Sequence, residues 1–294
     1  MSDALLEAVT RELGTALGQN LRLVNFQRVA GGDINQAYRL DLGSLEVFVK
    51  YNSRAKPGMF ETEAMGLEEL GKCGSLLVPK PVALGHHGAT AWLALEYLEL
   101  DGHKEYGAHA LGEGLARLHL QKQPFFGWWQ DNFIGSTPQP NARSDDWLSF
   151  YAENRLRFQV HRLIAAGAAK TLSRHCESLI DRMPGLFEAY TPQPSLLHGD
   201  LWGGNWAVTA RGQPVIYDPA SYYGDRETDL AMSELFGGFP SAFYHSYEQT
   251  FPSDPGYKRR KPLYQLYHVL NHANLFAGGY LARAEQMICR LIDD

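Results

Sequence analysis

The segment 197–205, with the sequence LHGDLWGGN, places an aspartate five residues before an asparagine in a loop that contains glycines. Phosphoryl transfer needs a carboxylate that orients the attacking hydroxyl group and a nearby oxygen ligand for a magnesium ion. We therefore predict that Asp200 is the catalytic residue and that Asn205 binds the metal. The glycines let the backbone turn back so that both side chains face one point, and His198 is expected to anchor the loop through hydrogen bonds of its ring.

A second carboxylate follows a short apolar stretch. In the segment 214–220, with the sequence PVIYDPA, a predicted strand delivers Asp218 at its end. Kinases place such an aspartate, within a DFG sequence, against the metal that bridges the terminal phosphates. Asp218 is therefore predicted to be a second metal ligand. Because Pro219 and Ala220 replace the Phe and Gly, no Phe-driven activation switch is expected.

Lys50 ends another apolar stretch, VFVK, and follows a turn that contains Gly31 and Gly32. This position matches the phosphate-binding lysine of kinases, which needs a carboxylate to hold it. We predict that Glu63, on the helix that follows, takes this part. The same helix carries three other acidic residues that could replace it: Glu61, Glu68 and Glu69.

The glycine turn is a weak signal by itself. Gly31, Gly32 and Asp33 lack the GxGxxG spacing of protein kinases, so an ordinary hairpin is an equally good interpretation of the turn alone. Its position before Lys50 favours phosphate binding. An acidic Asp33 would repel phosphates unless its side chain points away.

Two flanking segments are expected to support the site. Glu96, Tyr97 and Leu98 end the last strand before the helical part of the chain, where a hinge would offer backbone groups to adenine. Asp229 lies near the first turn of a helix that opens at Glu227, and its carboxylate is expected to brace the catalytic loop by accepting hydrogen bonds from backbone N–H groups.

The elements that position these residues fall into two groups. The first group alternates in the manner of strands, with an amphipathic helix before it and one helix inside it. Strands are expected near 23–29, 37–42, 45–51, 82–84 and 91–97, and helices over 3–17 and 60–73. The second group has helical periodicity over 108–120, 146–166, 170–190 and several segments from 227 to the end. The basic run 258–261, beside Pro255, Gly256 and Pro262, is expected to be a solvated loop.

This order predicts an α+β, two-lobed protein-kinase-like fold. Residues 1–97 would form a small lobe of antiparallel sheet plus helix that binds the nucleotide phosphates. Residues 98–294 would form a larger, mainly helical lobe with the catalytic loop and the substrate site. A chain of 294 residues is long enough for two such lobes.

Composition excludes several other classes. The formal net charge of −6 argues against binding to nucleic acid. Three widely spaced cysteines indicate neither a disulfide framework nor a zinc site, which favours a reducing compartment. With neither a signal peptide nor a membrane span in view, we expect a cytoplasmic protein without a membrane partner.

Taken together, these segments resemble the fructosamine/ketosamine kinase family, within the wider aminoglycoside phosphotransferase and choline kinase group. The likeness runs nearly end to end. Its most specific part is Trp202 in the catalytic loop, together with Phe126–Gly127 and the segments 131–135 and 139–141. The nucleotide-binding residues that the resemblance implies are Gly31, Gly32, Asn35, Lys50, Glu63, Glu96, Tyr97 and Leu98.

The resemblance implies an enzyme that uses ATP and Mg²⁺ to phosphorylate the 3-hydroxyl of a ketosamine, an amine joined to a sugar by glycation. The phosphorylated adduct then decomposes and frees the amine. The substrate would be a small-molecule or protein-bound ribulosamine, erythrulosamine or fructosamine adduct. Two alternatives stay open: another kinase of this fold, acting on an aminoglycoside, choline, homoserine or thioribose, and a nucleotide-binding pseudokinase that regulates a partner.

Overall fold

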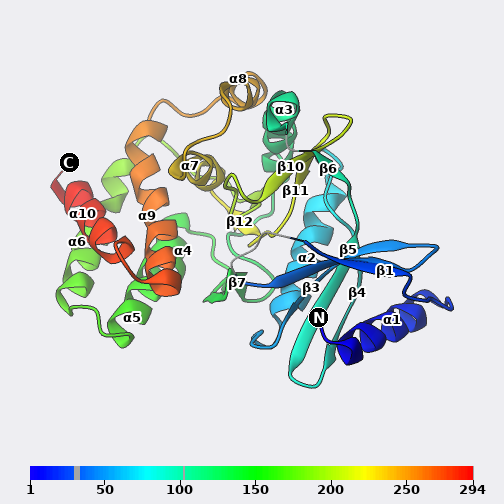
Figure 1. Cartoon of the computed structure of the whole chain (residues 1–294). Coiled ribbons are helices and arrows are strands. Elements are labelled where there is room, and N and C mark those ends of the chain that lie inside the picture. The colour runs from blue at the N-terminus through cyan, green and yellow to red at the C-terminus, as the bar shows by residue number, and fades with distance from the viewer. Residues whose placement is uncertain (30–33, 102, 294) are drawn as a thin grey trace.

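The computed structural model of the protein describes residues 1–29, 34–101 and 103–293, which form two lobes (Figure 1). The first lobe contains a five-stranded sheet in the spatial order β1 (Asn25–Val29), β2 (Gln36–Asp41), β3 (Glu46–Asn52), β5 (Thr90–Glu96) and β4 (Pro81–His87). All neighbouring strands are antiparallel. The two-lobed α+β arrangement predicted from the sequence is confirmed, whereas the domain boundary after residue 97 stays a prediction.

Helix α1 (Asp3–Leu17) covers the outer face of this sheet. The Ser2 side chain accepts a hydrogen bond from the Leu5 N–H at 3.3 Å and so caps the helix. Gly18 ends it in a left-handed conformation, with φ 62°. The apolar face of α1 and the outer face of the sheet share a small core: Leu5, Leu6, Val9, Leu13, Leu40, Val47, Val49 and Trp92.

Helix α2 (Met59–Lys72) packs against the helical lobe as well as the sheet. A Cβ atom at Gly66 would lie 3.3 Å from Pro219 Cγ, so the two segments are in close contact. The Tyr223 hydroxyl donates a hydrogen bond to Glu69 Oε1 at 3.0 Å. α2 is therefore fastened to the second lobe at the same time as it supports the first.

The second lobe is mainly helical and, within the described residues, carries three small sheets. Its helices are α3 (Ala108–His119), α4 (Trp147–Tyr151), α5 (Phe158–Ala165), α6 (Thr171–Leu186), α7 (Glu227–Leu235), α8 (Ser241–Thr250), α9 (Tyr257–Phe276) and α10 (Tyr280–Asp293). A 3₁₀ turn, Lys104–Tyr106, precedes α3, and a π-helical turn, Ala152–Arg157, joins α4 to α5. The sheets pair β6 (Leu100–Asp101) and β11 (Pro214–Ile216) with β10 (Trp206–Thr209), β9 (Ser195–Leu197) with β12 (Tyr222–Gly224), and β7 (Asn132–Ile134) with β8 (Thr137–Gln139).

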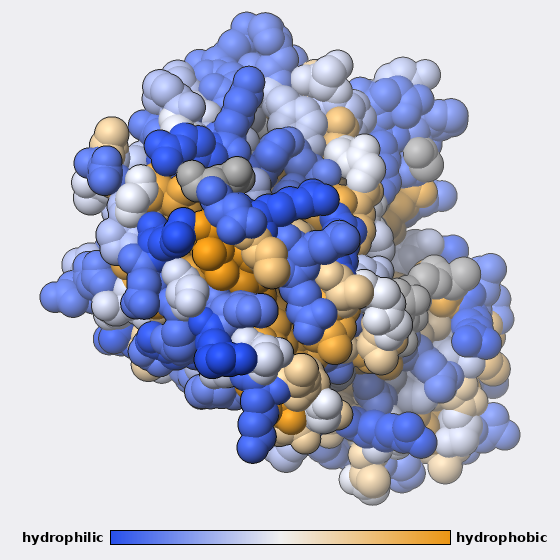
Figure 2. All heavy atoms as spheres, turned by 90° about the vertical axis from the view of Figure 1, so that its left-hand side faces the viewer, coloured by the Kyte–Doolittle hydropathy of each residue, from blue (hydrophilic) through white to orange (hydrophobic). Residues whose placement is uncertain are grey.

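The helices α5, α6 and α10 lie at the end of the second lobe that is farthest from the five-stranded sheet (Figure 1). Seen from that side, polar side chains cover most of the surface and apolar ones show between them (Figure 2). Among the described residues, no helix is both long enough and apolar enough to cross a bilayer.

The basic run 258–261 is not a loop, so that prediction is wrong. It lies in the first turns of α9, and Arg260 is only 2% exposed. Its guanidinium group donates two hydrogen bonds to Glu227, at 2.7 and 2.8 Å, and a third to Asp254 at 2.6 Å. The flanking prolines and glycine suggested a loop, but Gly256 is the residue before the helix and the buried ion pair holds its first turns in place.

Replacing Arg260 by Met is expected to destabilise the protein by about 3–5 kcal/mol, because Glu227 would be left as a buried charge without its partner. Urea unfolding followed by circular dichroism measures the change. Arg259→Met is the matched control, since Arg259 is exposed on the same turn. Equal stabilities of the two variants would contradict this account of the ion pair.

Candidate active site

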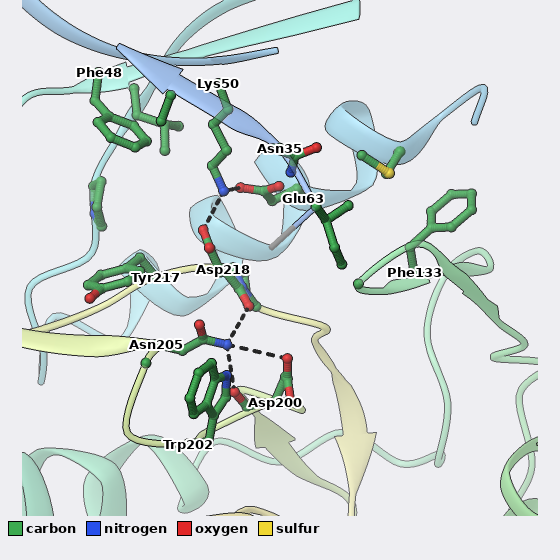
Figure 3. Close-up of a pocket in the computed structure, with 18 of the residues that line it drawn as sticks. Asn35, Phe48, Lys50, Glu63, Phe133, Asp200, Trp202, Asn205, Tyr217 and Asp218 are labelled. Atoms are coloured by element: carbon green, nitrogen blue, oxygen red, sulfur yellow. Dashed lines mark hydrogen bonds and ion pairs between the residues drawn. The ribbon is translucent and has the colours of Figure 1, made fainter. Parts of the chain in front are cut away.

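A cleft of about 1220 Å³ lies between the two lobes, and it collects nearly all of the candidate residues. Its lining includes Lys50 and Glu63 from the first lobe and Asp200, Asn205 and Asp218 from the second. Figure 3 shows these five side chains converging from β3, α2 and the catalytic loop with the segment after β11. The sequence therefore identified residues that lie far apart in the chain and meet in one cavity.

Lys50 lies on β3 and reaches toward α2 and Asp218. Its ammonium group forms ion pairs with the carboxylates of Glu63 and Asp218 (Figure 3). Burial alone would lower the pKa of Lys50, but these two carboxylates raise it above its ordinary value, so the side chain stays charged. Of the four glutamates considered, Glu63 is the one placed against Lys50; Glu69 instead pairs with Lys72.

Glu63→Gln is expected to lower kcat/KM for MgATP by roughly 10-fold or more, because hydrogen bonds to a charged group contribute about 1.5–3 kcal/mol. The loss arises from a Lys50 ammonium group that is no longer held on both sides. Steady-state kinetics with varied MgATP measure it, with Glu68→Gln on the exposed face of the same helix as control. An unchanged kcat/KM in the Glu63 variant would remove Glu63 from the site.

Asp229 supports the catalytic loop, as predicted from the sequence. Asp229 Oδ2 accepts the N–H of His198 and Oδ1 accepts the N–H of Gly199, both at 2.8 Å. Burial alone would raise the pKa of Asp229, but the hydrogen bond and charge of His119, together with the backbone donor, hold it below its ordinary value. The carboxylate of Asp229 therefore fixes the catalytic loop to α7 through these two hydrogen bonds.

His198 also anchors the loop. Its Nε2 lies 3.0 Å from the carbonyl oxygen of Tyr217, and its Nδ1 accepts the N–H of Asp200 at 3.2 Å. Because Nδ1 is an acceptor, the hydrogen of the neutral ring lies on Nε2 and points at the carbonyl. Burial lowers the pKa of His198, in agreement with a neutral ring. The imidazole thus joins the catalytic loop to the residue before Asp218.

Gly199 is required where the catalytic loop passes the segment after β11. Its φ is +84°, and a Cβ atom there would lie 2.1 Å from the carbonyl oxygen of Ala220. The Ala220 N–H in turn donates to the carbonyl oxygen of His198 at 2.9 Å. Any larger residue would push the two segments apart and separate Asp200 from Asp218.

Asn205 connects the two aspartates. Its Nδ2 donates to the carbonyl oxygen of Asp200 at 2.9 Å and lies 3.3 Å from Asp200 Oδ2 and 3.4 Å from the Asp218 carbonyl oxygen (Figure 3). Burial, and then the nearby charges of Asp218 and Asp229, raise the pKa of Asp200 to about 7. A carboxyl group with such a pKa can take up and release a proton near neutral pH.

The oxygens that remain are suited to a magnesium ion. No hydrogen bond from the described residues reaches Asn205 Oδ1 or Asp218 Oδ2, and the Asp218 side chain is 45% exposed to the cleft. Magnesium prefers oxygen ligands and is usually held by one or two carboxylates together with substrate phosphates. Asn205 and Asp218 therefore fit a metal ion that is shared with a nucleotide.

The backbone of Asp218 is unusual for a residue that is not glycine, with φ 57°. Such left-handed conformations are sparsely populated and collect at functional sites, although aspartate and asparagine tolerate them best. The conformation lets the chain turn sharply after β11, so that the carboxylate faces Lys50.

The cleft also contains an apolar slot beside the predicted hinge. Phe48, Leu95, Val215 and Tyr217 line it together with Glu96, Tyr97 and Leu98. The backbone N–H and carbonyl of Leu98 make no hydrogen bond with the described residues. An apolar slot with free backbone groups at its edge is suited to a flat base such as adenine.

The structure describes only part of the predicted glycine turn. Gly31, Gly32 and Asp33 lie outside the described residues. Asn35 lines the cleft, and its Oδ1 accepts a hydrogen bond from Asn52 Nδ2 at 3.0 Å. Asn52 therefore holds Asn35 beside β3.

Sequence reasoning missed several lining residues. Phe48 points into the cleft because it lies two residues before Lys50 on the same strand, and alternation alone could have found it. The acceptor side beyond Asp200 is mostly aromatic and comes from four separate segments, of which the sequence had singled out Trp202 and the segment 131–135. It comprises Phe133, Trp202, Phe236, Asn271, His272, Leu275, Phe276 and Tyr280.

Comparison with solved structures first defines the class of fold. Aminoglycoside phosphotransferase APH(4)-Ia, solved as a ternary complex of a thermostable mutant with AMP-PNP and hygromycin B, aligns with a TM-score of 0.65 at 15% identity. The alignment covers 97% of this chain and 98% of that chain. At such identity the likeness shows the fold alone, and it confirms the predicted kinase-like fold.

Closer relatives then give the family. The sequence model of the fructosamine kinase family matches residues 5–294. A probable ketoamine kinase of Synechocystis is 43% identical, covering 98% of this chain and 97% of its own length. A chloroplastic protein-ribulosamine 3-kinase of Oryza sativa subsp. indica is 39% identical, over 97% and 84%. A crystal structure of a putative fructosamine-3-kinase from Haemophilus somnus aligns with a TM-score of 0.87 at 28% identity, over 96% of both chains. The chain belongs to the fructosamine kinase family.

Proposed function

We propose that this protein is a kinase that uses ATP and Mg²⁺ to phosphorylate the 3-hydroxyl of ketosamines and thereby starts the deglycation of amines or protein lysines. The convergence of Lys50, Asp200, Asn205 and Asp218 on one cleft, in a chain of this family, carries the proposal. The names of the Synechocystis and Oryza relatives support a ketosamine as the acceptor.

Each of these residues has a definite task in the proposed reaction. Lys50, held by Glu63, faces the nucleotide phosphates, while Asn205 and Asp218 hold the metal. Magnesium, when bound, neutralises charge on the phosphate oxygens. Asp200 orients the substrate hydroxyl and accepts its proton as the new bond to phosphorus forms. Most of the acceleration arises from positioning and charge neutralisation.

The charge of the acceptor side favours a ketosamine over an aminoglycoside. Among the described residues that line the cleft, the carboxylates are Glu63, Glu96, Asp200 and Asp218. Glu63 and Asp218 are paired with Lys50, and Glu96 lies at the hinge. Among these lining carboxylates, Asp200 is therefore the one that remains to face an acceptor. A polycationic aminoglycoside would need several such groups, whereas a ketosamine carries one amine.

The proposal is tested by following ADP release with magnesium and a panel of acceptors. The panel contains a ribulosamine, an erythrulosamine, a fructosamine, an aminoglycoside and choline. Each ketosamine is supplied both as the adduct of a small amine and as the adduct on a glycated protein. Phosphorus and carbon NMR of the product locate the new phosphate. Phosphorylation at the 3-hydroxyl of a ketosamine is expected.

Three results separate the possibilities. Turnover of a ketosamine that is lost in Asp200→Asn supports the proposal. Turnover of the aminoglycoside or choline alone would keep the kinase and reject the substrate. Binding of MgATP without any turnover would favour a pseudokinase. A cytoplasmic location, and a lack of nucleic-acid and membrane partners, stay predictions from the sequence.

A further inference from the structure

His268 is a buried polar residue beside the catalytic aspartate. It lies on α9, is 3% exposed, and its Nδ1 has no hydrogen-bond partner within residues 1–29, 34–101 and 103–293. A buried polar atom without a partner is costly and calls for an explanation. Asp200 Oδ1 lies 3.9 Å from this nitrogen. The unpaired atom thus faces the carboxylate that the reaction uses.

The imidazole of His268 is neutral. Burial is the main cause that lowers its pKa to about 3; the neighbouring His272 acts in the same direction, Asp229 acts in the opposite direction, and Arg155 adds the smallest lowering effect. A neutral imidazole carries one N–H group, on either nitrogen. With the hydrogen on Nδ1, the ring offers a donor to the carboxylate; with the hydrogen on Nε2, a lone pair would face a negative charge. The Nδ1–H form is therefore the stable one.

Asp200 has room for this donor. Its Oδ2 lies 3.3 Å from Asn205 Nδ2, which is a long contact, and its Oδ1 faces His268. An ionised carboxylate offers about four acceptor positions, so two donors leave a place for the substrate hydroxyl. A separation of 3.9 Å is too long for a hydrogen bond. Catalytic hydrogen bonds are often long in unliganded enzymes, however, and shorten when the substrate binds.

We propose that His268 is a positioning residue, which donates its Nδ1–H to Asp200 Oδ1 in the substrate complex and holds the carboxylate in line with the acceptor hydroxyl. Together with Asn205 it fixes the plane of the carboxylate from two sides. His268 acts through Asp200 and takes up no proton itself. The inference rests on the role of Asp200 in phosphoryl transfer, and does not depend on which acceptor the enzyme uses.

Two substitutions separate this role from simple packing. His268→Leu fills much of the same volume but removes the donor. His268→Asn keeps an N–H donor, because the amide nitrogen of Asn and Nδ1 of His are both attached to Cγ. The Leu variant is expected to lose about 10- to 100-fold in kcat, a loss of the size found for residues that orient metal ligands through a hydrogen bond. The Asn variant should recover to within a few-fold of the unmodified protein, and KM for MgATP should change less than about twofold in both.

A double-mutant comparison shows whether the effect passes through Asp200. On an Asp200→Asn background, His268→Leu should cause no further loss of kcat, since the carboxylate that it positions is gone. Thermal unfolding and ADP binding are measured on every variant to confirm that each is folded. MgATP hydrolysis without an acceptor is followed in parallel, so that water in place of the hydroxyl tests His268 even if no ketosamine is turned over.

The outcomes are distinct. A loss in kcat that is rescued by Asn and is absent on the Asp200→Asn background supports the proposal. Three results would overturn it: kcat of His268→Leu within twofold of the unmodified protein, an Asn variant as slow as the Leu variant, or an undiminished loss on the Asp200→Asn background. If no ketosamine reacts but hydrolysis follows the expected pattern, the proposed substrate fails and the role of His268 stands.

Discussion

Asp200→Asn is expected to lower kcat by about 10³-fold, near the middle of the range for loss of a general base, while the affinity for MgATP changes less than about threefold. The substitution keeps the shape of the side chain but removes the group that accepts the proton. Asp200 lies on the acceptor side of Asn205, away from Lys50, so nucleotide contacts are preserved. Initial rates with a ketosamine and calorimetric titration with the nucleotide measure the two quantities.

A matched control for this variant is Asp181→Asn, an exposed aspartate on α6. It should leave both quantities unchanged. The smallest loss typical of a general base is about 100-fold. If Asp200→Asn lost less than about 10-fold in rate, Asp200 would not be the catalytic residue. If nucleotide affinity collapsed together with the rate, the substitution would have disturbed the metal ligands, and the role of Asp200 would have to be reassigned.

Asp218→Asn is expected to lower kcat/KM for MgATP by about 10²–10³-fold, as does the loss of other groups that stabilise charge in a transition state. Asparagine tolerates the left-handed backbone that Asp218 adopts, so the chain turn should survive and the change should isolate the charge. Lys50 would keep Glu63 as its partner. Rates measured over a magnesium titration should show a higher magnesium requirement than the unmodified protein.

The same variant offers its own check. Because Asn keeps one oxygen ligand, a high magnesium concentration should recover part of the lost activity. Thermal unfolding should shift little, since the Asp218 side chain is 45% exposed. A magnesium requirement identical to that of the unmodified protein would exclude Asp218 as a metal ligand.

The parts of the fold that follow from local periodicity were predictable. The bounds of α1 agree with the prediction because its apolar residues recur at helical spacing and Ser2 and Gly18 mark its ends. Side chains along each strand of the first lobe alternate between the two faces of the sheet. The sequence therefore predicts that Val47 and Val49 lie on one face and Lys50 on the other, as they do. The predicted site residues that the structure describes all lie in one cleft, because their spacing is tied to strand ends and one loop.

What could not be predicted depends on contacts between distant segments. Arg260 is buried because it forms an ion pair with Glu227, which lies on another helix. The sequence around residue 260 does not indicate this partner. Because α9 passes the catalytic loop, His268 lies beside Asp200 and Asn271 lines the cleft. Their helical spacing is the same as that of residues that face a core, so periodicity could not separate the two environments.

The attachment of α2 to the helical lobe has a consequence for control of the enzyme. In a protein where the glutamate-bearing helix can swing away, a signal can switch activity off by separating the lysine from its glutamate. Here Gly66 lies against Pro219, and Glu69 accepts a hydrogen bond from Tyr223, so that Glu63 cannot leave Lys50 without breaking contacts on both sides. A movement of α2 that separated Glu63 from Lys50 would therefore also break the packing between the two lobes, so the ion pair and the lobe contact are coupled.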